Sequence, residues 1–277
     1  MVNSTVIIEN FTYNLKFQNG FWQAKEEDKL SYPSDGNAIC FDIESESFWF
    51  RNRNRIILEA VKKYSVEGPI FDVGGGNGFV ADYLCKNSFD TILVEPGIDG
   101  CINGKKRGLK YVINAFADRE HFYANRMPNI GIFDVLEHIE DPDKFMNTLS
   151  NFLIKDGRLF VTVPAFQSLW SAEDVHAGHY RRYRIRELER MLADNGFEIL
   201  FSTYFFSFLF IPVFILRAIP SKIGVYKQNI QRSKKQHSSN AITSKLLDNL
   251  TNIELWKIGR GKSIKYGSSL LIVAKKR

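Results

Sequence analysis

Short apolar runs alternate with segments of helical periodicity through most of the chain. Strands are predicted at 69–73, 89–95, 110–115, 129–137, 156–165, 197–205 and 268–277. Helices are predicted at 47–64, 78–87, 142–153 and 184–196, the last of them ended by Gly196. Strands that alternate with helices are typical of a doubly wound α/β sheet built mainly of parallel strands.

This pattern divides the chain into four parts. Residues 1–64 are an N-terminal extension that ends in a cap helix, and residues 65–203 are the α/β core. Residues 204–263 form an insert that begins apolar and becomes basic. Residues 264–277 supply the final core strand. We expect ligands to bind beyond the carboxyl ends of the parallel strands.

A glycine turn follows the first core strand, in the sequence FDVGGGNG. Its pattern is D-x-G-x-G-x-G, formed by Asp72, Gly74, Gly76 and Gly78. The dinucleotide fingerprint G-x-G-x-x-G would need a third glycine where Phe79 stands. An acid at the strand end suits a ligand that carries an amine. The other interpretation is a tight turn without a ligand.

Glu95 ends the second core strand, in the run TILVE. An acid in this position can accept hydrogen bonds from both hydroxyls of a ribose. The glycine turn and Glu95 together therefore indicate an adenosine ligand, although a strand-end acid can also be merely solvated.

Further motifs extend this likeness along the chain: FWFRNRN, LVEPG, FDVLEHIEDP, GRLFVTVPA, LWSAEDVHAGHYRRY, LADNGFEI and YGSSLLIVAKK. With them the sequence resembles the class I S-adenosylmethionine-dependent methyltransferases, in particular the bacterial type 11/12/23 group, over about 47–218 and 264–277. The resemblance implies a Rossmann-like, doubly wound sheet of seven strands, six parallel and the last antiparallel. It also implies a cap helix over the cofactor and S-adenosylmethionine as the cofactor, and we expect the insert at 204–263 to form a C-terminal helical lid.

The resemblance also implies a cofactor site. Its residues are Phe50, Arg53, Asp72, Gly74, Gly75, Gly76, Asn77, Gly78, Glu95, Pro96, Asn114, Ala115, Phe116, Asp134, Val135 and Leu136. In this arrangement the glycines pass under the methionine part and Asp72 lies near its amino group. Glu95 holds the ribose hydroxyls, and Arg53 meets the carboxylate of the cofactor.

Acceptor chemistry is expected after the fourth and fifth strands. A base is needed when the acceptor is a hydroxyl or a protonated amine, and histidine is the usual choice. We expect His138, His179 and Asp174 to act in catalysis. The residues expected to bind the acceptor are Trp170, Arg181, Arg182 and Tyr183. The alternative is a structural loop held by salt bridges.

A metal is not expected from these patterns. The spacing of Asp174, His176 and His179 is compatible with metal ligands, but a second carboxylate is missing from an obvious place. Cys40, Cys85 and Cys101 have no metal-binding or redox spacing, and reduced thiols in the cytoplasm are expected because no signal peptide is visible.

The charge of the chain is asymmetric. The net charge is +6, and residues 221–277 hold thirteen Lys/Arg against two Asp/Glu. Residues 201–216 carry no charge, but they are too short for a comfortable membrane span and Pro212 interrupts them. We expect peripheral contact of 204–235 with an anionic membrane, on the inner face, or else a lid packed on the core. Motifs of nucleic-acid base methylation are absent.

The combined prediction is methyl transfer from S-adenosylmethionine to an oxygen or nitrogen of a small molecule, such as a glycan or lipid intermediate. A nicotinamide-dependent oxidoreductase and a non-catalytic cofactor-binding scaffold are the alternatives.

Overall fold

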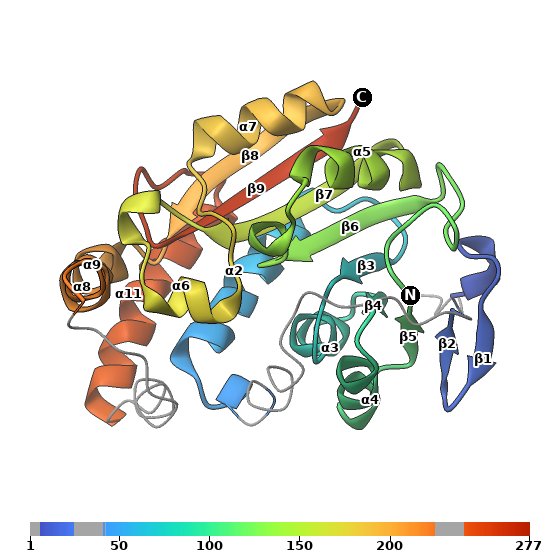
Figure 1. Ribbon diagram of the computed structural model, residues 1–277, viewed down its shortest axis with the longest axis horizontal. Helices are drawn as coiled ribbons and strands as arrows, with labels where there is room; N and C mark the ends of the chain where they lie inside the picture. Colours follow the sequence, from blue (N-terminus) through green and yellow to red (C-terminus); the bar gives the residue numbers. More distant parts are fainter. Residues whose placement is uncertain (1–5, 25–40, 42, 225–240) are drawn as a thin grey trace.

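The computed structural model describes residues 6–24, 41, 43–224 and 241–277. One sheet runs through the molecule (Figure 1). Its strands are β1 (Lys16–Gln18), β2 (Phe21–Gln23), β3 (Ile70–Val73), β4 (Thr91–Val94), β5 (Tyr111–Asn114), β6 (Met127–Phe133), β7 (Leu153–Pro164), β8 (Phe197–Phe205) and β9 (Ser269–Lys276).

The strands lie in the order β1-β2-β5-β4-β3-β6-β7-β9-β8. All seven predicted strands are present, and β9 runs antiparallel to both of its neighbours, β7 and β8. The other pairs in the core are parallel. The mixed α/β class is confirmed, but the predicted count of seven strands is wrong because the N-terminal extension adds two.

The additional strands form a hairpin at the edge of the sheet. Asn19 and Gly20 join β1 to β2, with φ angles of 56° and 85°. Two positive φ angles in a two-residue connection match the right-handed twist of the flanking strands, and Asn-Gly is the sequence that favours them. The β2 strand then pairs in parallel with β5.

Helices cover both faces of the sheet (Figure 1). They are α2 (Phe48–Tyr64), α3 (Phe79–Lys86), α4 (Ile98–Lys106), α5 (Pro142–Phe152), α6 (Ala172–Ala177), α7 (Ile185–Asp194), α8 (Phe210–Val213), α9 (Ile219–Lys222) and α11 (Ala241–Gly259). Side chains of α5 and α7 pack in one apolar cluster, whereas those of α2, α3 and α11 pack in another on the opposite face. Neither α4 nor α6 was among the helices expected from the sequence.

Local signals explain where several of these helices begin and end. The Asp141 side chain accepts a hydrogen bond from the backbone N–H of Lys144 at 3.1 Å, which satisfies a free donor in the first turn of α5. Pro142 occupies the first turn, where its missing N–H costs nothing. Gly196 follows α7 with φ at 84°, as expected for a helix end.

The insert after β8 holds two kinds of helical segment. The short helices α8 and α9 flank a π-helical segment, η5 (Phe214–Ala218), and α11 packs against α2. The predicted insert begins two residues early, because Tyr204 and Phe205 still belong to β8. Among the described residues, no helix has the length and apolar character to cross a membrane. Cys40 and residues 225–235 lie outside the described residues.

The edge hairpin contributes to the core through one side chain. Phe21 is 2% exposed and packs with Ala81, Leu93 and Leu109, whereas Phe17 on the same hairpin is 62% exposed. We expect Phe21→Ala to lower the free energy of unfolding by about 3–5 kcal/mol, measured in urea. The control Phe17→Ala should change it by less than about 0.5 kcal/mol. A loss of unfolding free energy in Phe21→Ala as small as that of the control would show that the hairpin is not part of the core.

Candidate functional site

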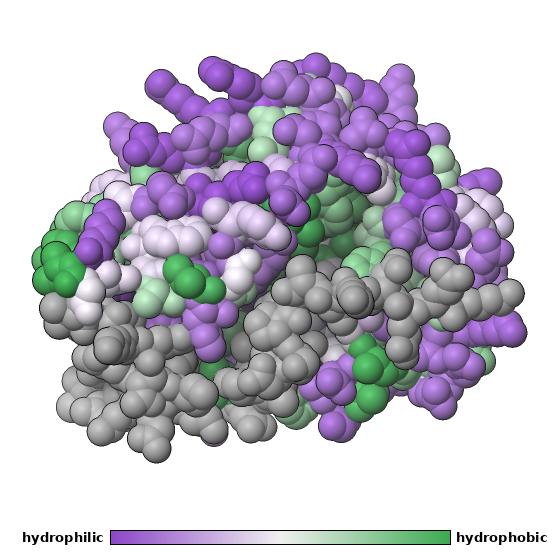
Figure 2. Space-filling model, viewed as in Figure 1, coloured by the Kyte–Doolittle hydropathy of each residue, from purple (hydrophilic) through white to green (hydrophobic). Residues whose placement is uncertain are grey.

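The carboxyl ends of four parallel strands lie next to one another. Register places Val73 of β3 beside Val94 of β4, and β6 pairs with β3 on its other side. Beyond these ends the Gly74 N–H donates to the Val94 carbonyl at 2.8 Å, and the Glu95 N–H donates to the Ile113 carbonyl at 2.9 Å. The glycine turn and Glu95 are therefore held together at one edge of the sheet. The space-filling view is hollowed near its centre, with apolar residues at the bottom of the depression (Figure 2).

The glycine turn needs its glycines for two separate reasons. Gly74, Gly76 and Gly78 have φ angles of 70°, 54° and 70°, which side chains disfavour. A Cβ on Gly75 would lie 2.6 Å from Asp72 Oδ2, and one on Gly74 would lie 2.9 Å from the Val135 side chain. The turn therefore passes directly over Asp72 and against the end of β6.

Glu95 is buried and ties the turn to the second strand. Its Oε2 accepts the Gly76 N–H at 2.9 Å, and its Oε1 accepts the Gly97 N–H at 2.8 Å. Burial raises the pKa of Glu95, while these two hydrogen bonds lower it. An ionised carboxylate has about four acceptor positions, so two remain for hydroxyl donors of a ligand.

Asp72 is fully buried beneath the turn. Its Oδ2 accepts the Ala81 N–H at 3.1 Å, but its Oδ1 has no hydrogen-bond partner among the described residues. Burial raises the pKa of Asp72 to about 7, against the opposing attraction of Arg53. A carboxylate oxygen without a donor fits a ligand that brings a cationic amine, as the sequence predicts for this position.

Arg53 and Asp134, both predicted to contact the cofactor, contact each other. Arg53 Nη1 lies 2.7 Å from Asp134 Oδ2. The guanidinium carbon lies 5.0 Å from the centre of the Trp49 ring and 5.3 Å from that of Phe50. Asp134 has a φ of 59° at the end of β6, a backbone region that side chains rarely adopt. Helix α2 is thereby joined to the carboxyl end of β6, and its cationic group already has an acidic partner.

The remaining predicted cofactor residues lie along the same edge. Asn77 is buried and hydrogen-bonded to Asn103 and Glu44. Asn114 ends β5 and donates to the carbonyls of Glu95 and Pro96 at 3.1 and 2.8 Å. Ala115 and Phe116 follow it, and Val135 and Leu136 follow Asp134. Their roles toward a ligand stay predictions.

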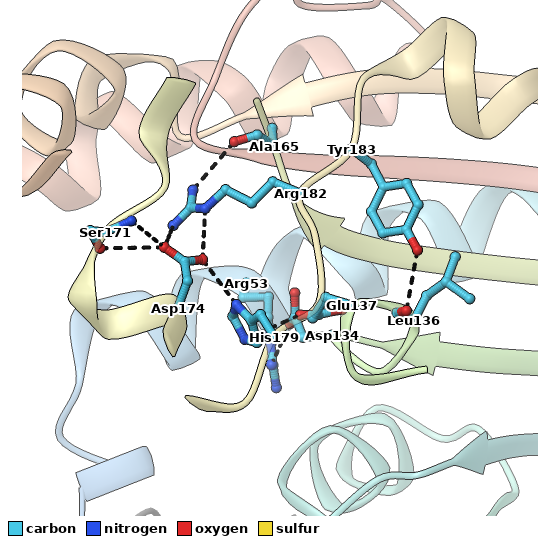
Figure 3. A network of polar contacts seen from close by, with 10 residues as sticks. All are labelled: Arg53, Asp134, Leu136, Glu137, Ala165, Ser171, Asp174, His179, Arg182 and Tyr183. Atoms are coloured by element: carbon cyan, nitrogen blue, oxygen red, sulfur yellow. Dashed lines mark hydrogen bonds and ion pairs between the residues drawn. The ribbon is translucent and has the colours of Figure 1, made fainter. Parts of the chain in front are cut away.

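Asp174 is the centre of a polar network that includes two of the predicted acceptor-side residues, His179 and Arg182 (Figure 3). Its carboxylate accepts from Arg182 Nε at 2.7 Å and Nη2 at 3.0 Å, and lies 2.9 Å from His179 Nδ1. It also accepts the Ser171 N–H at the start of α6. Burial would raise the pKa of Asp174, but the hydrogen bonds from His179 and Arg182 outweigh it and lower the pKa to about 2.

This arrangement fixes the tautomer of His179. Because Nδ1 donates to the Asp174 carboxylate, the lone pair is on Nε2. Nε2 lies 4.0 Å from Glu137 Oε1, and the His179 ring is 4.8 Å, centre to centre, from the His138 ring. Burial lowers the pKa of His138 to about 4, and His179 adds to this effect. The Nε2 lone pair can accept a proton or bind a metal ion.

The predicted acceptor residues hold the loop in place. Arg182 is engaged by Asp174, and Arg181 donates to the Glu140 carbonyl at 2.9 Å. The hydroxyl of the buried Tyr183 donates to the Leu136 carbonyl at 3.2 Å. Trp170 is half-buried just before α6. The loop that follows α6 is thus pinned to the segment after β6, and contact of these side chains with an acceptor stays a prediction.

Glu137 is the residue that sequence reasoning missed. It is 1% exposed, directly precedes His138, and its Oε2 has no hydrogen-bond partner among the described residues. The sequence offers only an acid beside His138 in the run FDVLEHI, and its burial, which is rare for an acid without a charged partner, is visible only in the fold. His176 is exposed and belongs to no metal-ligand cluster among the described residues, so the spacing of Asp174, His176 and His179 does not form a site.

Comparison with known proteins gives consistent matches. A family model described as a methyltransferase domain matches residues 44–201. Two curated Mycobacterium tuberculosis proteins, each named a probable S-adenosylmethionine-dependent methyltransferase, are 23% identical over 173 residues, or 58% of this chain. The match covers 60% of the length of these relatives.

Two solved structures illustrate the likeness of fold. A Thermotoga maritima SAM-dependent methyltransferase, described as a possible histamine N-methyltransferase, has a TM-score of 0.53 at 16% identity, over 86% of this chain and 93% of that one. A Haemonchus contortus phosphoethanolamine N-methyltransferase 2 in complex with S-adenosyl-L-methionine has a TM-score of 0.52 at 15% identity, over 90% of this chain and 58% of that one.

Asp72 provides a pH-dependent test of the site. Its pKa is raised in the folded state, so its stabilising contribution is complete below pH 4 and is lost as the pH rises through about 7. We expect Asp72→Asn to remove this loss, so that its stability relative to the unmodified chain increases between pH 4 and 7 and then levels off. Urea unfolding across this range measures the difference. The Asp90→Asn variant removes an exposed acid and controls for the loss of one charge. If the difference in unfolding free energy between Asp72→Asn and the unmodified chain did not change from pH 4 to 7, the raised pKa of Asp72 would be contradicted.

Proposed function

Because the chain belongs to the methyltransferase domain family, and within it to the class I S-adenosylmethionine-dependent methyltransferases, we propose that it methylates an oxygen or nitrogen of a small-molecule acceptor. S-adenosylmethionine is the cofactor. The observation that carries the proposal is the pair of buried acids, Asp72 and Glu95, on either side of the glycine turn.

The two acids suit two different groups of the cofactor, its ammonium group and its ribose. The unpartnered Asp72 Oδ1 would receive the ammonium of the methionine part. The free acceptor positions of Glu95 would receive the two ribose hydroxyls. Methyl transfer is a displacement in line with the bond that breaks, so the main work of the protein is to hold acceptor and methyl group in contact.

The acceptor is proposed to bind beside His179 and His138, between the segment after β6 and the loop after α6. The His179 ring lies beside the His138 ring and 4.0 Å, at Nε2, from Glu137 Oε1, just beyond the end of β6. His179 Nε2 offers a lone pair there, held in orientation by Asp174. With a pKa of about 4, His138 is a weak base at neutral pH, which favours His179 as the group that acts on the acceptor.

The insert after β8 carries an exposed aliphatic surface, and we propose that it contacts a lipid surface. Five aliphatic side chains of α8, η5, α9 and the residue after it are 40–68% exposed: Ile211, Ile215, Leu216, Ile219 and Ile223. Most are three to four residues apart, so they share one side of the helical segment. Arg217 and Lys222 add positive charge to the same segment. Apolar exposure beside positive charge suits contact with an anionic membrane, and hence a lipid or lipid-linked acceptor.

Glu95→Gln tests the cofactor assignment. The amide offers one acceptor oxygen instead of two and no charge, so we expect S-adenosylhomocysteine to bind about tenfold to a hundredfold more weakly by isothermal titration. The matched control is Asp99→Asn, which removes an exposed acid from α4 and should bind like the unmodified chain. Unchanged affinity in Glu95→Gln would remove the ribose role.

The membrane contact is tested with vesicles. We expect the full chain to co-sediment with phosphatidylglycerol vesicles, and Ile215→Asp/Leu216→Asp to reduce binding at least tenfold, because two apolar side chains would no longer be buried in lipid. The control Ile98→Asp/Ile102→Asp makes the same change on exposed residues of α4. No binding by the unmodified chain, or equal loss in both variants, would contradict the contact.

A further inference from the structure

We propose that Glu137, His138 and His179 bind a divalent transition-metal ion, which in turn binds the oxygen of the acceptor. The inference rests on the proposed methyl transfer for its use, but not for its geometry. The donor atoms come from two segments, the turn η2 (Leu136–His138) after β6 and the loop after α6. Figure 3 shows His179 and Glu137 close together at the centre of the polar network.

Each of the three side chains places one donor atom near the other two. One atom from each side chain lies within 4.8 Å of the others, and His179 Nε2 is 4.0 Å from Glu137 Oε1. Ligands of one zinc ion, with bonds of about 2.0–2.2 Å, lie about 3–4 Å apart. Binding would therefore draw the donor atoms together by up to about 1.5 Å, which rotation of the side chains about their χ angles can supply.

Glu137 supplies an observation that is independent of the cluster. Its side chain is 1% exposed, and its Oε2 has no hydrogen-bond partner among the described residues. The two neighbouring acids have their own arginines: Asp134 pairs with Arg53 at 2.7 Å, and Asp174 pairs with Arg182 at 2.7 Å. Among the described residues, the only ion-pair contact of Glu137 is the one with His179 at 4.0 Å, and Arg53 and Arg182 act on its charge only from a longer distance. A bound cation would supply the missing charge.

The orientation of His179 is the one that metal sites use. A histidine that binds a metal through one ring nitrogen commonly donates its other N–H to a carboxylate. Here Nδ1 lies 2.9 Å from Asp174 Oδ1, and Nε2 is directed toward Glu137. Asp174 is held in turn by Arg182 and by the Ser171 N–H. The outer partners of a metal site are therefore already in place.

The donor set identifies the class of ion. Two imidazoles and one carboxylate suit zinc, or the related ions iron(II) and cobalt(II), better than magnesium or calcium, which prefer oxygen ligands alone. Three protein ligands leave a fourth position open, as in catalytic rather than structural zinc sites. An acceptor that binds at the open position through oxygen would be an alcohol or a phenol, the class that we propose here.

The ion would then make that oxygen a better nucleophile. With its Nε2 lone pair on the ion, His179 would act on the acceptor through the ion and not as a free base. The bound hydroxyl would have a lower pKa and would give its proton to water. The oxygen forms a bond to the methyl carbon, the carbon–sulfur bond breaks, and its electron pair stays on sulfur as S-adenosylhomocysteine. The sulfonium loses its positive charge and one proton is released from the hydroxyl, so the total charge is the same before and after the step.

The test is metal binding by the full chain after treatment with a chelator. Zinc is titrated by calorimetry, and cobalt(II) is followed by its visible absorption, which distinguishes a four-coordinate protein site from the six-coordinate aqueous ion. We expect one ion per chain. Glu137→Gln and His179→Gln should each weaken binding by more than tenfold, since even loss of an outer partner costs about 10–100-fold. The control His176→Gln alters an exposed histidine three residues before His179 and should bind like the unmodified chain.

Three results would overturn the proposed metal site. No saturable zinc or cobalt binding by the unmodified chain would overturn it and leave Glu137 as a protonated carboxylic acid. Equal affinity in Glu137→Gln and the unmodified chain, or loss only in His176→Gln, would also overturn it. Titration of every sample with S-adenosylhomocysteine, without metal, reports folding and the cofactor site separately. If Glu137→Gln does not fold, His179→Gln and the cobalt spectrum of the unmodified chain decide.

Discussion

Burial of carboxylates at the carboxyl edge of the sheet is the constraint on which the site depends. Asp72, Glu95, Glu137 and Asp174 are all buried there, and a buried charge is costly unless it is paired. Asp174 has Arg182 and His179, and Glu95 has two backbone N–H groups. Only Asp72 and Glu137 among these four retain a carboxylate oxygen without a partner in the described structure. We infer that these two acids are completed by ligands.

Asp72 and Glu137, the two acids with an unpartnered oxygen, lie on different sides of the proposed site. Asp72 lies under the glycine turn, on the side of the proposed cofactor, whereas Glu137 lies after β6, on the side of the proposed acceptor. The ion pair of Arg53 with Asp134 stands between them and joins α2 to the end of β6. The positive charge of Arg53 lowers the pKa of both Asp72 and Glu137 against the larger effect of burial, so this one ion pair influences both acids.

Much of the fold was predictable because the core strands are short apolar runs separated by clear helical periodicity. The edge hairpin was missed although Asn19-Gly20 is a strong turn signal, because its strands are only three residues long. Among the predicted cofactor residues, the positions of Asp72 and Glu95 at the ends of core strands were expected from the sequence pattern. Glu137 could not be assigned from sequence: its importance comes from the loop after α6 bringing His179 beside it, and sequence spacing does not reveal that contact.

Thermal unfolding with S-adenosylhomocysteine and, separately, NADH tests the cofactor assignment most directly. At about a hundred times its dissociation constant, a ligand of the folded state adds about 2.7 kcal/mol, which for a chain of this size raises the melting temperature by several degrees. The account predicts such a shift with S-adenosylhomocysteine and none with NADH. A shift with NADH alone, or no shift with either, would contradict a site built for an adenosyl amino acid.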